Sequence, residues 1–173
     1  MTSSLTLKND ESLVFCHVNT IPQTHIPTSD TLVDWLRETV QCIDVRKGCD
    51  TGHCGTCAVL VDDTPMKSCS VMAQEVENRN VFTLAGLSLI DSPVTRAVLD
   101  ADAQLQPFQC AYCKPAFILA TIELLQESSQ PTEAVVREAF SGLLCRCTGF
   151  QHIVDMALLA ASRLHHSLQE NEQ

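Results

Sequence analysis

Cysteine is the residue whose number and spacing point to chemistry in this chain of 173 residues. Thiolates bind metal ions or react with oxidants, and clustered thiols in a reducing compartment usually do one or the other. Eight of the cysteines form two sets of four, separated by residues 70–109, which contain none. The full set is Cys16, Cys42, Cys49, Cys54, Cys57, Cys69, Cys110, Cys113, Cys145 and Cys147. This grouping predicts two metal sites.

The first set has the spacing C-x4-C-x2-C-x11-C and consists of Cys49, Cys54, Cys57 and Cys69. A C-x4-C-x2-C start with a distant fourth cysteine is typical of plant-type [2Fe-2S] ligation. Gly48, Gly52 and Gly55 permit the tight loop that converging thiolates need, and they let backbone amides point at sulfur. A structural zinc site is the alternative, but such sites more often show paired C-x2-C hooks without loop glycines.

The second set consists of two close pairs, Cys110 with Cys113 and Cys145 with Cys147. Each pair lies where a predicted helix begins or ends, so helix N-terminal amides would favour the negative charge of bound thiolates. A C-x-C pair alone is a weak signal. Both pairs together, at the ends of successive helices, predict the second metal site.

The remaining candidate residues have simpler interpretations. Cys16 and Cys42 have no partner at a metal-binding spacing, and we interpret each as an ordinary buried thiol. We interpret His53 as a solvated loop residue, because four cysteines already complete the first site. The sequence shows no Ser/His/Asp set, phosphate-binding glycine loop or recognisable carboxylate pair. We therefore expect no substrate chemistry on this chain.

The net charge of the chain and its expected cellular compartment narrow the classes of protein to which it could belong. The chain carries 21 acidic and 11 basic side chains, a formal charge of −10, which argues against non-specific binding to nucleic acid or anionic membranes. No apolar run is long enough for a membrane span. Residues 1–10 show neither a basic segment before an apolar stretch nor a twin arginine, so we expect a cytoplasmic protein with reduced thiols.

Sequence patterns predict an α+β fold. The first cysteine set falls in a part made of strands and one helix, and the second falls in a helical part. In the first half, a capping box at Thr31 and Asp34 begins a predicted helix that runs to about residue 41. Predicted strands cover residues 12–18, 58–61 and 81–83, and a turn covers residues 62–65. After Pro93 the apolar period changes to 3.6, which predicts four amphipathic helices packed as a small bundle. We expect the boundary between the two domains within residues 84–92.

Four ordered motifs carry a resemblance over nearly the whole chain. They are residues 31–38, the loop 48–57, residues 109–115, and residues 141–153 with the sequence SGLLCRCTGFQHI. In these motifs the chain resembles the small iron–sulfur subunit of the molybdenum hydroxylases, the family of xanthine oxidase and aerobic carbon monoxide dehydrogenase. The resemblance implies a plant-type ferredoxin-like (β-grasp) domain in residues 1–86 and a helical domain in residues 87–173, each with one [2Fe-2S] cluster.

The resemblance also implies partners and a direction for the electrons. In this family a large subunit oxidises the substrate at a molybdopterin cofactor, and electrons pass through the helical-domain cluster and then the ferredoxin-domain cluster. They usually continue to FAD in a medium subunit. By the same resemblance, Gln109 and Cys147 are expected to contact the pterin. The alternatives are a free-standing two-cluster ferredoxin or redox sensor, and a zinc-stapled interaction module.

The chain departs from the family pattern around the second cysteine set. The usual C-G-F/Y-C-T-P-G appears as CAYCKPA, which places Ala111, Lys114 and Ala116 where glycine, threonine and glycine are usual. Leu143 replaces the asparagine of G-N-L-C-R-C. All eight ligand cysteines remain, so these changes alter the hydrogen bonding around the second cluster rather than its ligands.

Overall fold

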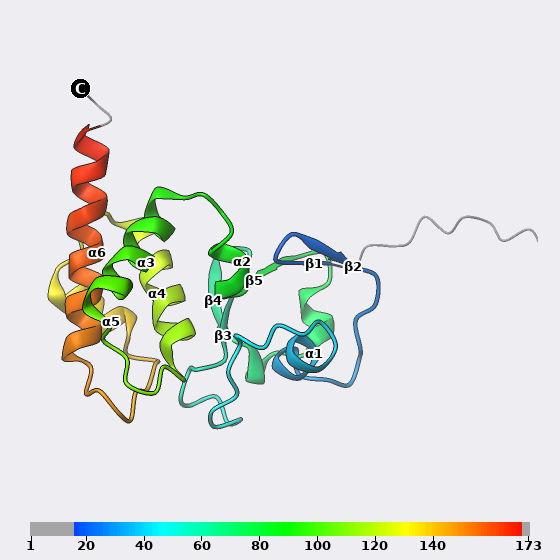
Figure 1. The fold of residues 1–173 in the computed structure, drawn as a ribbon. Helices are drawn as coiled ribbons and strands as arrows, with labels where there is room; N and C mark the ends of the chain where they lie inside the picture. Colours follow the sequence, from blue (N-terminus) through cyan, green and yellow to red (C-terminus); the bar gives the residue numbers. More distant parts are fainter. Residues whose placement is uncertain (1–15, 171–173) are drawn as a thin grey trace, which may run out of the picture.

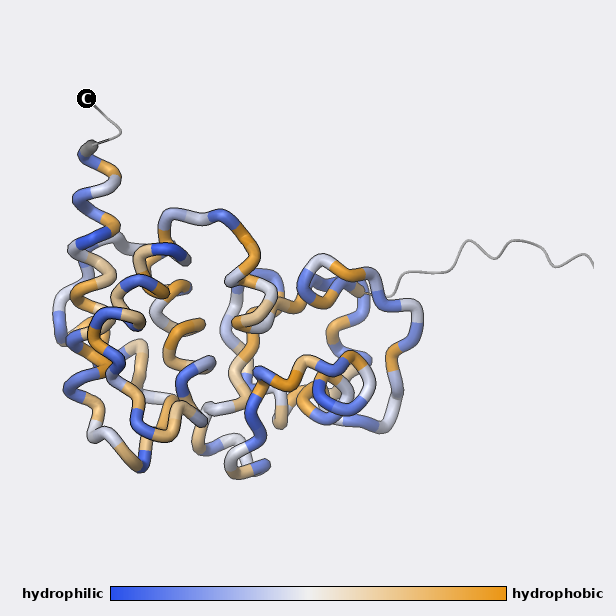
Figure 2. The backbone as a smooth tube through the Cα atoms, viewed as in Figure 1, coloured by the Kyte–Doolittle hydropathy of each residue, from blue (hydrophilic) through white to orange (hydrophobic). Residues whose placement is uncertain are grey.

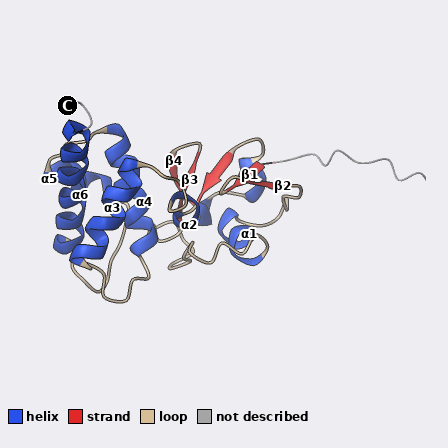
Figure 3. Cartoon of the chain, turned by 45° about the horizontal axis from the view of Figure 1, so that its top comes forward, coloured by secondary structure: helices blue, strands red, loops and turns tan. Residues whose placement is uncertain are grey.

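The computed structural model describes residues 16–170, which form two parts lying side by side (Figure 1). A mixed β-sheet with a helix packed against it makes up the N-terminal part, and helices make up the C-terminal part (Figure 3). The predicted α+β class is therefore confirmed. No helix in this part of the chain is long and apolar enough to cross a membrane.

Five short strands form the sheet in the order β2-β1-β5-β3-β4. Strands β1 and β5 run parallel, and the other neighbouring strands are antiparallel. The strands are β1 (Cys16–Val18), β2 (Ile21–Gln23), β3 (Ala58–Val61), β4 (Thr64–Lys67) and β5 (Asn80–Phe82). The long connection from β2 to β3 carries both a helix and three of the four cysteines of the first set.

Helix α1 (Leu32–Glu38) buries its apolar face in the core of the N-terminal part, where Trp35 is fully buried. The Thr31 hydroxyl accepts a hydrogen bond from the Asp34 amide at 3.3 Å, which confirms Thr31 as the cap at the predicted helix start. The Asp34 carboxylate in turn accepts from that hydroxyl at 2.7 Å. The prediction that the helix reaches about residue 41 is wrong by three residues. Gln41 takes a φ of 64°, a left-handed conformation that cannot continue an α-helix.

The strand predictions agree with the structure in the centre of the sheet and miss its edges. Strand β3 has the predicted bounds, and β5 lies one residue before the predicted strand 81–83. The predicted strand 12–18 is observed from residue 16, and its first four residues lie outside the described residues. Strand β2 was not predicted, because its exposed sequence IPQ has no apolar alternation and contains proline.

The predicted turn at residues 62–65 is half as long as expected. Asp62 and Asp63, with φ of 46° and 63°, form a two-residue hairpin turn, as the positive φ at both positions allows. Thr64 and Pro65 already belong to β4. Proline is tolerated there because β4 is an edge strand whose outer amides need no partner strand.

The C-terminal part contains the four predicted helices and one short additional helix. They are α2 (Leu84–Leu87), α3 (Pro93–Leu105), α4 (Lys114–Glu127), α5 (Glu133–Ala139) and α6 (Gln151–Glu170). Helix α2, which was not predicted, begins inside the segment where we placed the domain boundary and contacts α4. Leu105 and Leu168 continue the apolar periodicity of α3 and α6 but are 42% and 43% exposed, because each lies near the end of its helix.

Helix α4 lies at the centre of the molecule and joins its two parts. It contacts α2, α3, α5 and α6 on the helical side and strands β3 and β4 on the other. Its sequence KPAFILATIELLQE is apolar around most of its circumference, as expected of a helix that is buried on several sides. Figure 2 shows hydrophobic residues along α4 and the neighbouring strands. The Leu60 side chain of β3 belongs to the same hydrophobic cluster as the helices.

An aromatic cluster connects the first turn of α4 with the segments that carry the second cysteine set. The ring of Phe117 is fully buried and meets the rings of Phe140 and Phe150 edge-on, with centroids 5.0 Å and 5.5 Å away. Phe108, in the segment before Cys110, lies 6.1 Å from Phe117. The loops around all four cysteines of the second set thus rest on one aromatic core.

We predict that Phe117→Ala destabilises the helical part by about 3–5 kcal/mol, because it leaves a cavity at the centre of the aromatic cluster. Val135→Ala on the exposed side of α5 is the control and should change the unfolding free energy by less than about 0.5 kcal/mol. Denaturant unfolding of the cluster-loaded protein, followed by far-UV circular dichroism, gives both values. Equal losses for the two variants would contradict this account of the core.

Candidate metal centres

The cysteines of the first set come from two segments at one end of the sheet. Cys49, Cys54 and Cys57 lie on the loop between α1 and β3, and Cys69 lies in a 3₁₀ turn (Ser68–Ser70) directly after β4. The β3–β4 hairpin brings Cys69 back beside Cys57, since Ser68 donates its amide and its hydroxyl to the Cys57 carbonyl at 3.3 Å and 2.6 Å. The hairpin thus brings the fourth cysteine of the predicted first set beside the third.

Backbone amides of the loop point at sulfur, as the glycine-rich sequence predicts. The amides of Cys54 and Thr51 donate to Cys49 Sγ at 3.3 Å and 3.4 Å. Hydrogen bonds from Thr51, followed by those from Cys54, lower the pKa of the Cys49 thiol to about 6. Gly52 and Gly55 take φ of 74° and 71°, which lets the loop turn inward between the cysteines. The loop therefore favours a thiolate at Cys49 before any metal binds.

The loop is also anchored to α1 through an ion pair. The Lys47 ammonium lies 2.8 Å from the Asp34 carboxylate and 2.9 Å from that of Asp50, next to the Cys49 thiol in sequence. Lys47 and Asp34 keep only about a third of their side-chain surface exposed. The ion pair fixes the start of the cysteine loop against the helix that precedes it.

The second set consists of two pairs of cysteines, and each pair joins two segments that are far apart in the chain. The sulfur atoms of Cys110 and Cys147 are 3.6 Å apart, and the Cys113 and Cys145 thiols are close enough for each to shift the pKa of the other. Cys113 is the N-terminal cap of α4, as the sequence indicated. The pairs therefore link the start of α4 with the loop that leads into α6.

Burial works against ionisation of two thiols, one in each set. Burial raises the pKa of Cys57 to about 11 and that of Cys113 to about 12, and these side chains are only 2% and 6% exposed. For Cys145 burial also raises the pKa, but the amides of Thr148 and Cys147 outweigh it and the pKa is lowered. Thiolates at Cys57 and Cys113 need a bound cation to compensate for lost hydration.

This pairwise arrangement fits [2Fe-2S] clusters. Two thiolates on one tetrahedral metal ion, at about 2.3 Å each, lie about 3.8 Å apart, close to the 3.6 Å separation of Cys110 and Cys147. Within residues 16–170, no three Cys, His, Asp or Glu side chains converge tightly enough to hold a single metal ion. A two-iron cluster takes two thiolates at each iron, so two neighbouring pairs are the arrangement that it needs.

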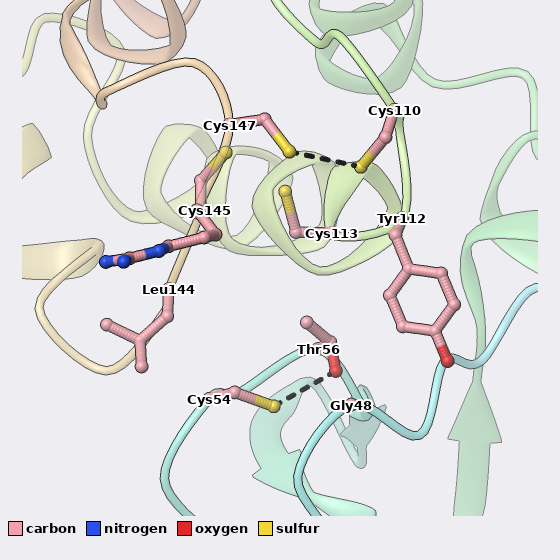
Figure 4. A pocket seen from close by; sticks show the side chains of 10 residues that line it. Gly48, Cys54, Thr56, Cys110, Tyr112, Cys113, Leu144, Cys145 and Cys147 are labelled. Carbon is pink, nitrogen blue, oxygen red and sulfur yellow. Dashed lines mark hydrogen bonds between the residues drawn. The ribbon is translucent and has the colours of Figure 1, made fainter.

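A cavity of about 410 Å³ lies between the two cysteine sets (Figure 4). It is lined by Gly48, Cys54, Thr56, Cys110, Tyr112, Cys113, Leu144, Cys145, Arg146 and Cys147. Figure 4 shows the second set on one side of this space and Cys54 with Thr56 on the other. Thiols of both predicted sites therefore face one common space.

Two hydrogen bonds hold the segments on either side of this cavity together. The Leu144 amide donates to the Cys54 carbonyl at 2.9 Å, and the Tyr112 hydroxyl donates to the Lys47 carbonyl at 2.9 Å. The Arg46 guanidinium lies 5.8 Å from the centre of the Tyr112 ring, within the range of a cation–π interaction. Sequence reasoning found the cysteines but not these contacts, which join residues far apart in the chain.

Gly55 is the point at which the two segments come closest. A Cβ atom at this position would lie 2.5 Å from the Gly142 carbonyl oxygen and 2.6 Å from the Leu143 side chain. Leu143, one of the departures from the family pattern, thus packs against the first cysteine loop. The Leu143 side chain is 7% exposed, so the contact is apolar and buried.

The other departures lie beside the start of α4. Ala111 takes a φ of 58°, a conformation in which alanine costs about 1–2 kcal/mol more than glycine. The Lys114 ammonium lies 2.5 Å from the carboxylate of Asp102 on α3, whose side chain is 8% exposed. Ala116 is 1% exposed and packs in the central core. Lys114 therefore ties α4 to α3 through this ion pair.

The structure also places the remaining candidate residues. Gln109, Cys110 and Cys147 are exposed, so the two residues expected to contact a pterin lie on one open face with a cysteine of the second set. Cys16 and Cys42 lie in or against the core of the N-terminal part, and burial raises the pKa of each thiol to about 11. Both are thus ordinary thiols, as the sequence suggested.

The fold and the paired thiols define an iron–sulfur protein with two cluster-binding parts. The family profile described as "2Fe-2S iron-sulfur cluster binding domain" matches residues 9–106. A second profile, described as "[2Fe-2S] binding domain", matches residues 83–158. Together they span both cysteine sets.

Known proteins extend this match. The chain is 34% identical over 139 residues to the nicotine 6-hydroxylase small subunit of Paenarthrobacter nicotinovorans, covering 80% of this chain and 82% of the relative. It is 36% identical over 146 residues to the xanthine dehydrogenase iron-sulfur-binding subunit of Escherichia coli O157:H7, covering 83% and 90%. A chain of quinoline 2-oxidoreductase from Pseudomonas putida 86 superposes with a TM-score of 0.79 at 30% identity, covering 88% of this chain and 95% of that one.

The chain belongs to the family of small [2Fe-2S] subunits of molybdenum hydroxylases. It is an iron–sulfur electron-transfer subunit of an oxidoreductase complex. These matches confirm the resemblance seen in the sequence. They favour a subunit over a free-standing ferredoxin or redox sensor, and two [2Fe-2S] domains over a zinc-stapled module.

We predict that Gly55→Ala weakens the contact between the two cysteine loops, whereas Gly149→Ala does not. Both glycines have a positive φ, of 71° and 78°, so both variants carry a backbone cost of about 1–2 kcal/mol. Only the Cβ at residue 55 meets other atoms; the one at residue 149 meets nothing within 4 Å. The overlap should add about 1–3 kcal/mol to the loss in Gly55→Ala.

Denaturant unfolding of the two cluster-loaded variants measures this difference, and bleaching of the visible absorption reports the loss of the clusters. If both variants lose the same unfolding free energy, the close approach at Gly55 carries no energetic weight.

Proposed function

We propose that this subunit relays electrons from a molybdopterin cofactor in a large partner subunit to FAD in a medium partner subunit. Cys110, Cys113, Cys145 and Cys147 would hold the first cluster on this route, and Cys49, Cys54, Cys57 and Cys69 the second. Each [2Fe-2S] cluster, when bound, accepts and releases one electron. We assign residues 1–86 to the ferredoxin-like domain and residues 87–173 to the helical domain, and we place the protein in the cytoplasm, where free thiols stay reduced.

The observation that carries this proposal is the common cavity between the two cysteine sets, together with the hydrogen bond across it. Cys54 and Cys145 are proposed ligands of different clusters, and only the Leu144 amide and the Cys54 carbonyl separate their main chains. An electron moving between the clusters therefore has a short covalent and hydrogen-bonded route. The folded chain supplies this route, and the hydrogen bond between Leu144 and Cys54 fixes its length.

The exposure of the cysteines supports the proposed direction of transfer. Cys110 and Cys147 are open at the surface together with Gln109, so a cofactor on a partner subunit can approach the helical cluster from outside. The Gln109 amide and the main chain at Cys147 offer hydrogen-bonding groups to a pterin ring. The first cysteine set lies on the other side of the cavity, nearer the sheet. We therefore place electron entry at the helical domain and exit at the ferredoxin-like domain.

The substrate of the complex is set by the partner subunits. The names of similar proteins include nicotine, nicotinate and xanthine enzymes and an aldehyde oxidoreductase, although all of these relatives are small or iron-sulfur-binding subunits. A small subunit of one fold therefore serves complexes with different substrates. This agrees with the lack of a substrate site among the motifs of the chain.

We predict that the purified, loaded subunit contains four iron and four acid-labile sulfide ions and shows two distinct EPR signals when reduced. Cys54→Ser and Cys113→Ser should each lose one of the two signals or give protein that does not assemble, because each removes a proposed ligand. Cys42→Ala is the matched control and should keep both clusters, since its thiol packs against the core of the N-terminal part and is not a proposed ligand. Stoichiometric zinc, or full iron content in Cys54→Ser and Cys113→Ser, would contradict the ligand assignment.

We also predict that the native protein purifies from its host with a molybdopterin-containing chain and an FAD-containing chain. Size-exclusion chromatography of an unheated extract, with cofactor analysis of the co-eluting chains, tests this. Elution of the loaded protein as a lone 19.0 kDa species would argue for a free carrier instead.

A further inference from the structure

Thr56 makes a contact that neither the cysteine spacing nor the family assignment accounts for. Its hydroxyl oxygen lies 3.1 Å from Cys54 Sγ, and the side chain points toward the cavity between the cysteine sets (Figure 4). Thr56 is only 6% exposed. A threonine hydroxyl is thus held beside one proposed ligand sulfur, on the side that faces the other cluster.

The direction of this hydrogen bond follows from the chemistry of the two groups. A cysteine sulfur bound to iron carries no proton, so it can only accept, and the Thr56 hydroxyl must be the donor. The same hydroxyl lies 3.2 Å from the Arg46 carbonyl oxygen, its other acceptor. With one proton and two acceptors, the hydroxyl favours the sulfur more strongly as negative charge on that sulfur increases.

Gly48 lies directly against this contact. A Cβ at Gly48 would lie 2.6 Å from the Thr56 hydroxyl and 2.9 Å from Cys54 Sγ, so the backbone of residue 48 packs on both atoms. The contact is half-buried, because Thr56 is buried while Cys54 is only partly so. A hydrogen bond to a charged sulfur has a larger electrostatic effect in such a partly desolvated place than it would in open water.

We propose that the Thr56 hydroxyl raises the reduction potential of the cluster held by the first cysteine set. Reduction adds negative charge that spreads onto the ligand sulfurs, and a donor to Cys54 stabilises the reduced form more than the oxidised form. The proton stays on the hydroxyl oxygen throughout, so no proton is transferred. Thr56 thereby makes this cluster the better acceptor for electrons that arrive across the cavity. The inference rests on the proposed role of Cys54 as a ligand.

The test compares Thr56→Val with Thr56→Ser in the cluster-loaded subunit. Valine keeps the shape of threonine but has no hydroxyl, whereas serine keeps the hydroxyl. Redox titration followed by EPR gives the midpoint potential of each cluster separately. We expect Thr56→Val to lower the potential of the first-set cluster alone, with Thr56→Ser close to the wild type. The second-set cluster is the internal control. An unchanged first-set potential in Thr56→Val would overturn the proposal.

A second measurement does not depend on a potential. ENDOR spectra of the reduced first-set cluster in H₂O and D₂O should show one exchangeable proton coupling in the wild type and in Thr56→Ser that is missing in Thr56→Val. Thr56→Ala serves as the hydroxyl-free variant if Thr56→Val loads poorly. Identical exchangeable couplings with and without the hydroxyl would overturn the proposal. A full first-set signal in Cys54→Ser would instead overturn the ligand assignment, so the two failures are distinguishable.

Discussion

The close approach of two backbone segments at Gly55 is the constraint on which the rest of the structure depends. One segment carries the first cysteine loop and the other leads into Cys145, and they touch because residue 55 has no side chain. The Leu144 hydrogen bond to Cys54, the packing of Leu143 and the common cavity all follow from this contact. Helix α4 supports this contact because it packs on the sheet with one side and on the other helices with the other.

Electrostatics explains why amides and hydroxyls surround the sulfur atoms of these loops. An oxidised cluster with four thiolates carries a charge of about −2, so two clusters take the formal charge of the chain from −10 to about −14. Neutral donors such as the amides beside Cys49 and Cys145 stabilise this charge at the sulfur atoms themselves. Basic side chains lie further out: Arg146 lines the cavity, and the Lys67 ammonium donates to the Gly52 carbonyl at 3.0 Å.

The sequence predicts the parts of this molecule that depend on local patterns. Cysteine spacing identified both thiol sets, the Thr31 cap identified the start of α1, strand propensity identified β3, and apolar periodicity identified helices α3 to α6. Strands β2 and β4 were missed because edge strands need no buried face. The Leu144 and Tyr112 contacts were missed because they join residues 90 and 65 positions apart, which only the folded chain brings together. Leu143 appears as a departure in the motif, and its packing partner is visible only in three dimensions.

The open face around Cys110 and Cys147 has a consequence for the life of the subunit before assembly. Cys110 and Cys147 are exposed, so a cluster held by them would be open to dioxygen, peroxide and chelators until a partner covered this face, whereas Cys57 and Cys113 are buried. Such a cluster would be lost more easily from the isolated subunit than from the complex. Docking soon after cluster insertion would shorten this exposure, which links the open face to the order in which a complex assembles.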